Sequence, residues 1–465
     1  MNEHRERSRR WTTALLVAVA FFAGLSVQHF VDAAPKNGTP YKKLNIFTKI
    51  LHYVETNYVE PVDDTKLVYG AIKGMLDTLD PHTVFMPPDL YKEMKVDTSG
   101  EFGGLGIEIT TKDGVLTVVA PIDGTPAHRA GVKSGDQILR IDGDSTKTMS
   151  LMDAVKKMRG PKGSKVKLTL RRKGERGTIQ ELVIVRDRIK VVSVDSRLLG
   201  SGVGVVRIKS FQERTDVYLK DSIEKLEQQF GAPLKGLVLD LRNNPGGLLE
   251  QAVRVSDAFI ESGLIVFTKG RQKGSVEREF AHPKGTRTDF PMVVLVNGGS
   301  ASASEIVAGA LQDHGRAVIL GTQTFGKGSV QTVTELEDGS GLKLTVAKYY
   351  TPKGRSIQEK GISPDIVVPE GTIAKATEKS TREKDLRGHL REEKKGPGSG
   401  TEEAKPKEGE PAAPKPDVKP DEKGEAKVES WGDASDLQLK AAHDYLKAWH
   451  IFKQSGKSAA VGGKR

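Results

Sequence analysis

The sequence predicts a mixed α/β fold with a mostly-β insertion, and three observations lead to this prediction. From about residue 188 to 370, continuous apolar runs alternate with amphipathic stretches, as in a sheet whose strands are buried on both faces. Residues 100–187 instead contain short alternating strands separated by Gly, Asp and Pro turns. Residues 371–430 are rich in Lys, Glu, Pro and Gly with few apolar residues, a composition typical of disorder. We therefore expect six segments: 1–33, 34–99, 100–187, 188–370, 371–430 and 431–465.

Composition excludes several classes of protein. The chain has 465 residues, which exceeds one ordinary domain, and no cysteine, which excludes disulfides, thiol catalysis and cysteine-ligated zinc. Its formal charge is +11, but basic and acidic residues are interleaved through most of the chain. We interpret this charge as solvated surface and expect no nucleic-acid partner.

The first segment has the pattern of an export signal. Several arginines precede an apolar run over residues 11–27, and Val31-Asp32-Ala33 offers the small residues that a signal peptidase requires. Because about 20 apolar residues span a bilayer, a cleaved signal peptide (1–33) and a membrane anchor remain alternatives. Both predict an exported protein, in the periplasm or on the outer face of the cytoplasmic membrane.

Two helices are predicted in the second segment. Apolar residues recur at spacings of three and four over residues 43–58, and a second helix covers about residues 64–79. Proline ends this helix in the turn Asp80-Pro81-His82-Thr83. His82 is a candidate ligand or base, although a lone histidine in a turn is more often structural.

The α/β segment predicts a buried sheet. Strands are expected at 202–208 and 236–241, with a helix at 215–229 between them, and strands at 342–350 and 366–368 are expected to finish the sheet. Beyond the charged stretch, apolar spacing predicts a helix within 431–452 that docks on the body of the protein.

The chemistry is predicted between Met292 and Gln331. An apolar run turns through Asn-Gly-Gly into a helix of small residues, which places a serine beside the unpaired amides of a helix N-terminus. Ser300, Ser302 and Ser304 compete for this place, and a capping box from Ser302 to Glu305 is the structural alternative. Lys327 follows between two glycines, which let the backbone approach a buried site.

This stretch resembles the catalytic core of the carboxyl-terminal processing proteases, also called tail-specific proteases. In that family a serine in SASASE pairs with a lysine twenty-five positions later and a glutamine four positions beyond it, which here are Ser302, Lys327 and Gln331. The resemblance covers about residues 43–370 and implies a ββα (crotonase/Clp-like) core. It also implies a serine endopeptidase that selects protein substrates by an apolar C-terminal tail and forms a homodimer through its N-terminal helices.

The turn Asp240-Leu241-Arg242-Asn243-Asn244-Pro245-Gly246-Gly247 also matches the family, in which it supplies an oxyanion-hole amide. We assign that amide to Gly246, with Gly247 nearly equivalent, and the second amide to Ala303. The turn has no Walker lysine and no Rossmann glycine spacing, so phosphate binding is not favoured.

Residues 100–187 resemble a PDZ domain through the loop Gly104-Leu105-Gly106-Ile107, the run Ala127–Asp136 and Ile141-Asp142-Gly143. Consecutive amides in a glycine loop can hold a terminal carboxylate, and the following strand edge can add a peptide by β-augmentation. We expect these four residues to bind the substrate tail, while the structural alternative is a simple turn.

The residues present require no metal and no cofactor. Lysine acts as a base only when neutral, so the pKa of Lys327 has to fall from about 10.4 towards roughly 7 to 8. His314 would lie roughly 18 Å from Ser302 along a continuous helix, too far to act as the base. Two competing classes remain: a non-catalytic PDZ adaptor on an inactive protease scaffold, and an acyl-coenzyme A enzyme of similar architecture.

Overall fold

A computed structural model of the chain describes residues 39–112, 114–172, 178–371, 381–386, 388–391 and 436–461. The chain divides into two compact units, Met1–Gly74 and Met75–Arg465. The expected signal or anchor at 1–33 and most of the expected linker at 371–430 lie outside the described residues. Within the described ranges, none of the helices is long and apolar enough to cross a membrane.

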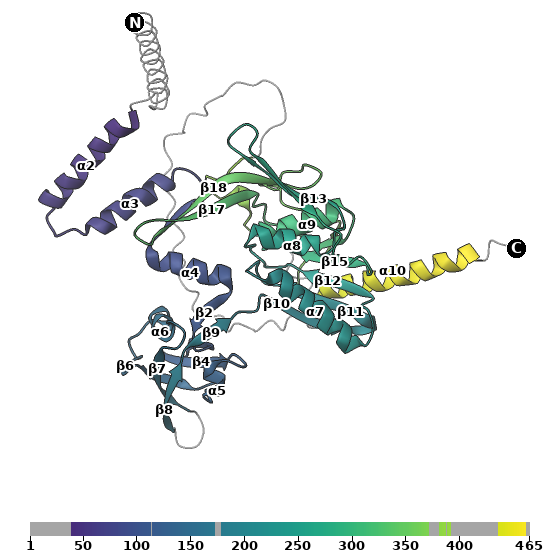
Figure 1. The fold of residues 1–465 in the computed structure, drawn as a ribbon, viewed down its shortest axis with the longest axis horizontal. Helices are drawn as coiled ribbons and strands as arrows, with labels where there is room; N and C mark the ends of the chain where they lie inside the picture. Colours follow the sequence, from purple (N-terminus) through teal and green to yellow (C-terminus); the bar gives the residue numbers. More distant parts are fainter. Residues whose placement is uncertain are drawn as a thin grey trace, which may run out of the picture. The chain divides into compact units, whose positions relative to one another are not determined.

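The first unit contains α2 (Thr39–Asn57) and most of α3 (Asp64–Leu76), which agree with the two predicted helices (Figure 1). Asp63 caps the N-terminus of α3, since its carboxylate accepts the backbone amide of Lys66 at 3.1 Å. Several large apolar side chains of α2 are exposed: Leu44, Ile46, Phe47, Ile50 and Tyr53.

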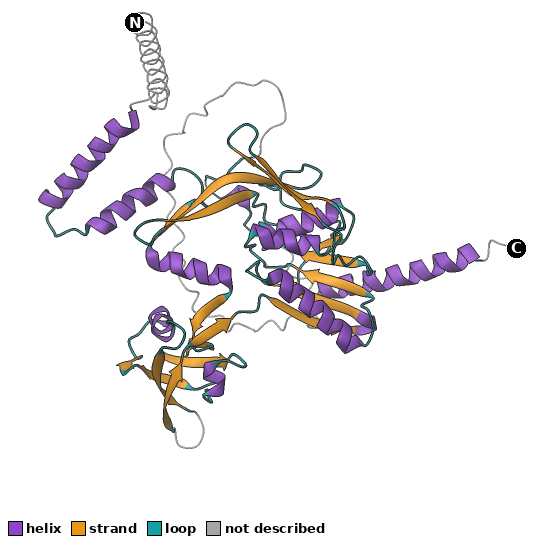
Figure 2. Cartoon of the chain, in the orientation of Figure 1, coloured by secondary structure: helices purple, strands orange, loops and turns teal. Residues whose placement is uncertain are grey.

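The inserted segment is an antiparallel sheet with two short helices (Figure 2). Its strand order is β3-β4-β5-β7-β8, with β6 paired to β5, and β3 is an edge strand. The alternation of apolar and polar residues explains why each strand buries one face. Along β7 the side chains of Val166, Leu168 and Leu170 are buried, and the residues between them face outward. The bounds are β3 (Ile107–Lys112), β4 (Val115–Pro121), α5 (Pro126–Arg129), β5 (Gln137–Ile141), β6 (Asp144–Ser145), α6 (Leu151–Met158), β7 (Lys165–Arg171) and β8 (Ile179–Val185).

A two-stranded ribbon lies at the start and end of this segment. It pairs β2 (Glu101–Gly104) antiparallel with β9 (Asp187–Lys190). The ends of the insertion are therefore held together, as an insertion between two parts of one core requires.

The core sheet has the strand order β10-β11-β12-β15-β16-β19. Its strands are β10 (Val194–Leu199), β11 (Val203–Ile208), β12 (Gly236–Asp240), β15 (Met292–Val296), β16 (Val318–Gly321) and β19 (Ile366–Val367). Only the β10–β11 pair is antiparallel within this sheet. Parallel strands need crossover connections, which bring the helices over the faces of the sheet.

Both faces of the core sheet are buried, as its apolar runs predict. Leu239 and Val294 lie in the larger apolar cluster with side chains of α7 (Thr215–Phe230), α8 (Leu249–Asp257) and α9 (Ala303–Asp313). The intervening Val238 and Leu295 lie in a second cluster with Leu439, Ala442 and Leu446 of α10 (Leu437–Val461). The predicted C-terminal helix therefore does dock on the body of the protein.

A second, antiparallel sheet corrects one prediction. It contains β1 (Val84–Met86), β13 (Gly263–Gly270), β14 (Val276–Ala281), β17 (Ser329–Glu335) and β18 (Gly341–Tyr350). The expectation that 342–350 would finish the core sheet is wrong, because β18 pairs with β1, β13 and β17. Its alternation of apolar and polar residues fits a sheet with one open face, whereas the core strands are apolar on both.

Part of the segment expected to be disordered is packed on the core. Residues 381–386 and 388–391 include a short 3-10 helix, η3 (Glu383–Asp385), and the Glu383 side chain is fully buried. From composition alone, we expect the charged side chains of this segment to remain in water. In the structure, charged groups of this segment have hydrogen-bond partners on the core. Helix α4 (Pro88–Ser99) connects β1 to β2, and its C-terminal end is closed by Gly100 at a positive φ of 66°.

Candidate active site

Ser302 lies at the turn between β15 and α9, where the backbone is strained. Its φ and ψ are 54° and −112°, a conformation that costs a non-glycine residue about 1–3 kcal/mol. The residue is 7% exposed, and its amide donates to the carboxylate of Glu305 at 2.8 Å. The fold therefore holds a nearly buried serine in a sharp turn at the start of a helix.

The other two serines of this motif have structural partners. The Ser300 hydroxyl donates to the carbonyl of Leu241 at 2.8 Å, and the Ser304 hydroxyl donates to that of Asn244 at 2.9 Å. Both bonds tie the start of α9 to the turn that follows β12. The Ser302 side chain takes part in the predicted capping box with Glu305, and it also hydrogen-bonds the hydroxyl of Tyr349, a residue whose pKa is raised by burial.

Glu305 joins the serine turn to the lysine loop. Its Oε2 atom accepts the amides of Ser302 at 2.8 Å and Lys327 at 2.9 Å, while Oε1 accepts the amide of Gly326 at 2.8 Å and the Thr324 hydroxyl at 2.6 Å. The side chain is fully buried, and this burial raises the pKa of Glu305 to about 7 despite the four donors. The sequence identified Glu305 only as a capping residue, and its bonds to the loop at 324–327 are a long-range contact that local spacing does not reveal.

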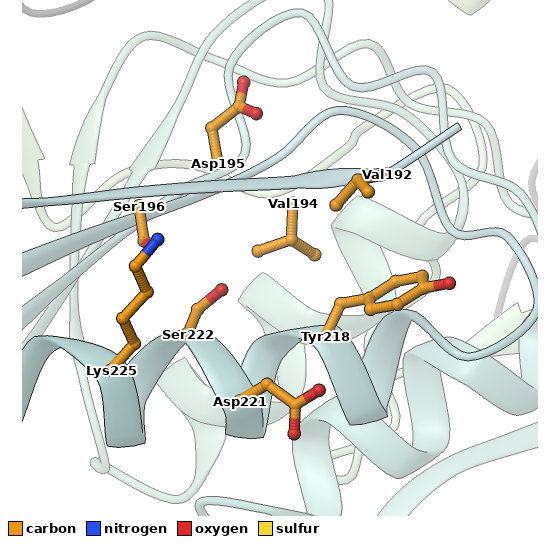
Figure 3. Close-up of a pocket in the computed structure, with 8 residues that line it drawn as sticks. All are labelled: Val192, Val194, Asp195, Ser196, Tyr218, Asp221, Ser222 and Lys225. Atoms are coloured by element: carbon orange, nitrogen blue, oxygen red, sulfur yellow. The ribbon is translucent and has the colours of Figure 1, made fainter. Parts of the chain in front are cut away.

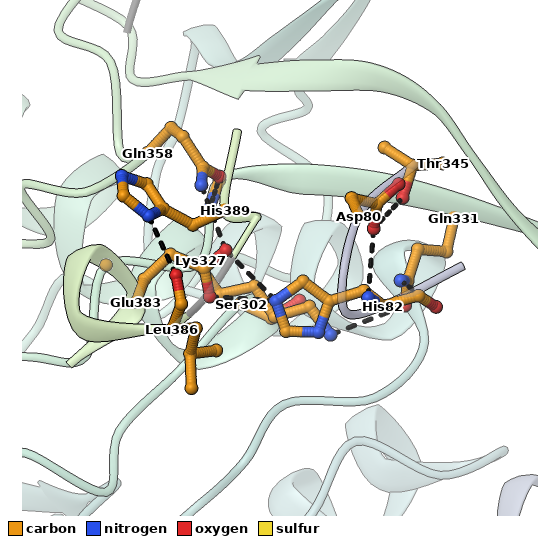
Figure 4. Close-up of polar contacts among 12 residues, drawn as sticks. Asp80, His82, Ser302, Lys327, Gln331, Thr345, Gln358, Glu383, Leu386 and His389 are labelled. Carbon is orange, nitrogen blue, oxygen red and sulfur yellow. Dashed lines mark hydrogen bonds and ion pairs between the residues drawn. The ribbon is translucent and has the colours of Figure 1, made fainter. Parts of the chain in front are cut away.

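Lys327 lies at the end of this loop with its ammonium group largely withdrawn from water. Its Nζ donates to Oε1 of Gln331 at 3.3 Å (Figure 4). Burial lowers the pKa of Lys327 to about 8, and the positive charge of Lys343 adds to this effect. The carboxylates of Glu383, Asp80 and Glu305 act in the opposite direction without reversing it.

Gln331 on β17 is held by the turn that contains His82. Its amide nitrogen donates to the His82 carbonyl at 2.9 Å, and the His82 ring lies 2.8 Å from the Glu383 carboxylate through Nε2. Asp80 fixes this turn by accepting the amides of His82 at 2.9 Å and Thr83 at 3.0 Å. Figure 4 shows these side chains beside Lys327. The sequence offered His82 as a candidate ligand or base, with a structural role favoured, and it did not single out Glu383.

The turn after β12 brings Gly246 against the serine. A side chain at Gly246 would place its Cβ 2.9 Å from the Cβ of Ser302 and 3.0 Å from the amide of Ala303, so only glycine fits there. The Gly246 amide, however, donates to Oδ1 of Asn244 at 2.9 Å. The Gly247 amide has no acceptor among the described residues. Ala303 is the first residue of α9.

Arg242 links the same turn to the C-terminal helix. Its Nη1 and Nη2 atoms donate to the two carboxylate oxygens of Asp436 at 2.8 and 2.7 Å, and its Nε donates to Asp240 at 2.9 Å. These charges are shielded, since the Arg242 side chain is 13% exposed and that of Asp436 is 17% exposed. The paired guanidinium lowers the pKa of Asp436 although burial acts against it.

The loop Gly104-Leu105-Gly106-Ile107 connects β2 to edge strand β3. Gly106 has a φ of 74° and lies against Thr125, whose hydroxyl donates to the Gly106 carbonyl at 3.1 Å. The Leu105 and Gly106 amides donate to no acceptor within the described part of the chain. Leu105 is buried, and Ile107 packs on the apolar cluster of the insertion.

His314 lies at the opposite end of α9 from Ser302, where its ring contacts the Leu264 carbonyl at 2.7 Å. Across the ranges that the structure describes, no group of three or more His, Cys, Asp or Glu side chains is arranged to hold a metal ion.

A pocket of about 410 Å³ lies elsewhere, between β10 and α7 (Figure 3). It contains none of the residues described above as parts of the candidate active site. Its lining residues are Val192, Val194, Asp195, Ser196, Tyr218, Asp221, Ser222 and Lys225.

Three family models match the chain. Residues 202–368 match peptidase family S41, residues 93–171 match the PDZ domain, and residues 20–89 match the activating protease CtpB N-terminal domain. The first two ranges contain the core with Ser302 and Lys327 and the insertion with the loop at 104–107.

Individual proteins agree with these matches. A carboxy-terminal-processing protease of Bartonella bacilliformis is 49% identical over 365 residues, which cover 77% of this chain and 84% of that protein. Carboxy-terminal processing protease CtpA of Bacillus subtilis is 43% identical over 335 residues, covering 72% of this chain and 70% of that protein. Among solved structures, the photosystem II D1 C-terminal processing protease is 34% identical, with 70% of this chain and 86% of that chain covered and a TM-score of 0.41.

Proposed function

Given that this chain belongs to peptidase family S41 and is a serine protease of the carboxy-terminal-processing kind, we propose that it is an exported endopeptidase with a Ser302–Lys327 dyad. In this proposal, the PDZ domain selects protein substrates by an apolar C-terminal tail. The observation that carries the proposal is that a single oxygen of Glu305 accepts the amides of both Ser302 and Lys327.

The proposed reaction begins with neutral Lys327, because only the uncharged amine accepts a proton. Burial favours this form, as the lowered pKa of about 8 indicates. Lys327 takes the hydroxyl proton of Ser302, the serine oxygen attacks the substrate carbonyl, and the lysine then protonates the leaving amine. Water hydrolyses the resulting acyl-enzyme through the same base. Gln331 orients the lysine through its bond to Nζ.

Two backbone amides would stabilise the oxyanion. Ala303 contributes one, and the turn after β12 contributes the other. The bond between the Gly246 amide and Asn244 supports Gly247 as the second donor in preference to Gly246. Gly246 is needed in this account because a larger residue would collide with Ser302.

The tail would bind at the loop 104–107 and along edge strand β3. The Leu105 and Gly106 amides suit a terminal carboxylate, and the apolar environment of Leu105 and Ile107 suits an apolar side chain. Two ion pairs connect this domain to β17 through α4. Lys156 of α6 lies 3.2 Å from Asp89 of α4, and Lys95 of α4 lies 2.6 Å from Glu335 of β17. β17 carries Gln331, so tail binding could activate the protease as well as tether its substrate.

Localisation and assembly belong to the same proposal. The sequence pattern of residues 1–33 supports export with either a cleaved signal or a membrane anchor. The exposed apolar side chains of α2, among them Leu44, Phe47 and Ile50, support a homodimer formed through the N-terminal helices.

The test uses purified protein and a model substrate that ends in apolar residues. We expect Ser302→Ala and Lys327→Ala to abolish cleavage, and the control His314→Ala, at the far end of α9, to retain most of it. Substantial turnover by Lys327→Ala would exclude the dyad. Tail binding without any cleavage by the unmodified protein would instead identify a PDZ adaptor.

A further inference from the structure

The packed part of the charged C-terminal stretch reaches the lysine site. We call residues 381–386 and 388–391 the post-core strap. The Glu383 amide donates to the Phe325 carbonyl at 3.2 Å, within the loop that carries Lys327. The Arg382 guanidinium donates to the Lys360 carbonyl at 2.8 Å. The strap is therefore attached both to the lysine loop and to a neighbouring loop of the core.

The side chain of Glu383 completes a closed ring of hydrogen bonds, and Figure 4 shows its members Lys327, Gln331, His82, Glu383 and Gln358. Starting from Lys327, the ring passes through Gln331, His82, Glu383 and Gln358 and returns to Gly328, the residue after the lysine. Its bonds are Lys327 Nζ to Gln331 Oε1 at 3.3 Å, Gln331 Nε2 to the His82 carbonyl at 2.9 Å, His82 Nε2 to Glu383 Oε2 at 2.8 Å, Gln358 Nε2 to Glu383 Oε1 at 3.0 Å, and Gly328 N to Gln358 Oε1 at 3.0 Å.

Glu383 is an unusual residue for a structural contact. Its side chain is fully buried, and removing a carboxylate from water costs several kcal/mol unless good partners replace the water. Burial alone would raise the pKa of Glu383, but the bonds to His82 and Gln358, together with the charge of Lys327, outweigh burial and lower it. The strap thus introduces a negative charge beside the lysine.

We propose that Glu383 is a positioning residue of the active site, which aligns Gln331 through His82 and stabilises the ammonium form of Lys327 that arises during acyl transfer. This inference rests on the proposed role of Lys327 as the base. The other charged groups that act on Lys327 are Lys343 of β18, Asp80 of the turn before β1, and Glu305 of α9. None of them belongs to the strap, so Glu383 supplies a contribution that can be removed separately.

The experiment compares pH profiles of kcat/KM for the full-length protein and Glu383→Gln, using a short peptide substrate. Because the glutamine lacks the charge that favours the ammonium form, the ascending limb of the profile should move to lower pH. The plateau kcat should fall about tenfold, as expected for loss of a charge-assisted contact. His82→Ala keeps the charge, so it should lower kcat without moving the limb to lower pH.

Asp385→Asn is the matched control. It neutralises a carboxylate in the same 3-10 helix, and that carboxylate accepts only the Arg382 amide among the described bonds. We expect its limb and kcat to match those of the unmodified protein. If the ascending limb of the pH profile and the plateau kcat of Glu383→Gln match those of the unmodified protein, the inference is overturned.

A second variant distinguishes a failure to fold from a loss of positioning in the active site. If Glu383→Gln does not fold, Glu383→Asp retains the charge on a shorter side chain, and the proposal requires a reduced kcat with a limb near that of the unmodified protein. An unchanged kcat would overturn it. If Lys327→Ala is inactive while Glu383→Gln behaves like the unmodified protein, only this inference fails. An active Lys327→Ala would instead overturn the proposed dyad itself.

Discussion

The carboxylate of Glu305 accepts the backbone amide of Lys327 at 2.9 Å, so the helix that begins after Ser302 directly holds the loop carrying the proposed base. The same oxygen accepts the Ser302 amide at 2.8 Å. The separation between the backbones of Ser302 and Lys327 is thus set by bonds to one buried side chain.

We expect Glu305→Gln to lower both stability and activity. Each carboxylate oxygen accepts N–H groups, so a glutamine would place its own NH₂ against at least one buried amide. A buried donor without a partner costs about 1–3 kcal/mol. Thermal unfolding should show a lower Tm, and kcat/KM should fall about 100-fold because the lysine loop shifts.

The control is Glu250→Gln, which removes an exposed carboxylate on α8 that pairs with Arg254. Exposed pairs contribute little, so its Tm and kcat/KM should stay near those of the unmodified protein. Normal kcat/KM in Glu305→Gln would show that the shared carboxylate is not needed to align the site.

The pH dependence of kcat/KM reports the protonation of the free enzyme's base. Since neutral Lys327 is the proposed base and its pKa is lowered to about 8, activity should be low in acid, rise through about pH 8, and reach a plateau above it. The measurement is a series of kcat/KM values with a substrate that does not titrate in this range. A flat profile from acid to neutral pH would argue against lysine as the base.

Amidating the C-terminus of a tail-dependent protein substrate should weaken its cleavage. The amide lacks the charge that the Leu105 and Gly106 amides would bind, and a charge-assisted bond contributes about 1.5–3 kcal/mol. The effect should appear in KM. Equal cleavage of the amidated and free-acid substrates would refute carboxylate recognition by the loop 104–107.

Deleting residues 100–187 then separates tethering from activation. Tethering alone predicts that a short peptide without the tail is cut equally well with and without the domain. Activation through the path from Lys156 to Glu335 predicts that the deletion changes this rate as well. The second outcome should be reproduced in part by Lys95→Ala, which removes the ion pair between α4 and β17.

The sequence predicted the elements whose patterns are local. Strand β12 differs by one residue from the predicted strand at 236–241, because a continuous apolar run reports directly on burial. Strand β18 was assigned to the wrong sheet, since an apolar pattern indicates that a strand is buried but does not identify its partner.

The candidate site likewise contains residues that the sequence predicts and contacts that it does not predict. The spacing of Ser302, Lys327 and Gln331 is visible in the sequence, whereas the contact between His82 and Glu383 joins residues from distant parts of the chain. Composition argues against any ordered contact for Glu383, because it lies among charged residues that ordinarily remain in water. Its bonds to His82 and Gln358, together with the charge of Lys327, offset the cost of its burial.

The packing of α10 and the strap against the core means that the candidate site receives its last contacts from residues made late in synthesis. The nascent chain emerges from its N-terminus at about 5–20 residues per second, so Ser302 and Lys327 appear well before Glu383 and Asp436. Until Asp436 arrives, Arg242 in the turn after β12 lacks one of its two carboxylates, and Val238 and Leu295 lack the cover that α10 provides. For about 5–20 s of synthesis, therefore, the chain carries Ser302 and Lys327 without the contacts that Glu383 and Asp436 later supply.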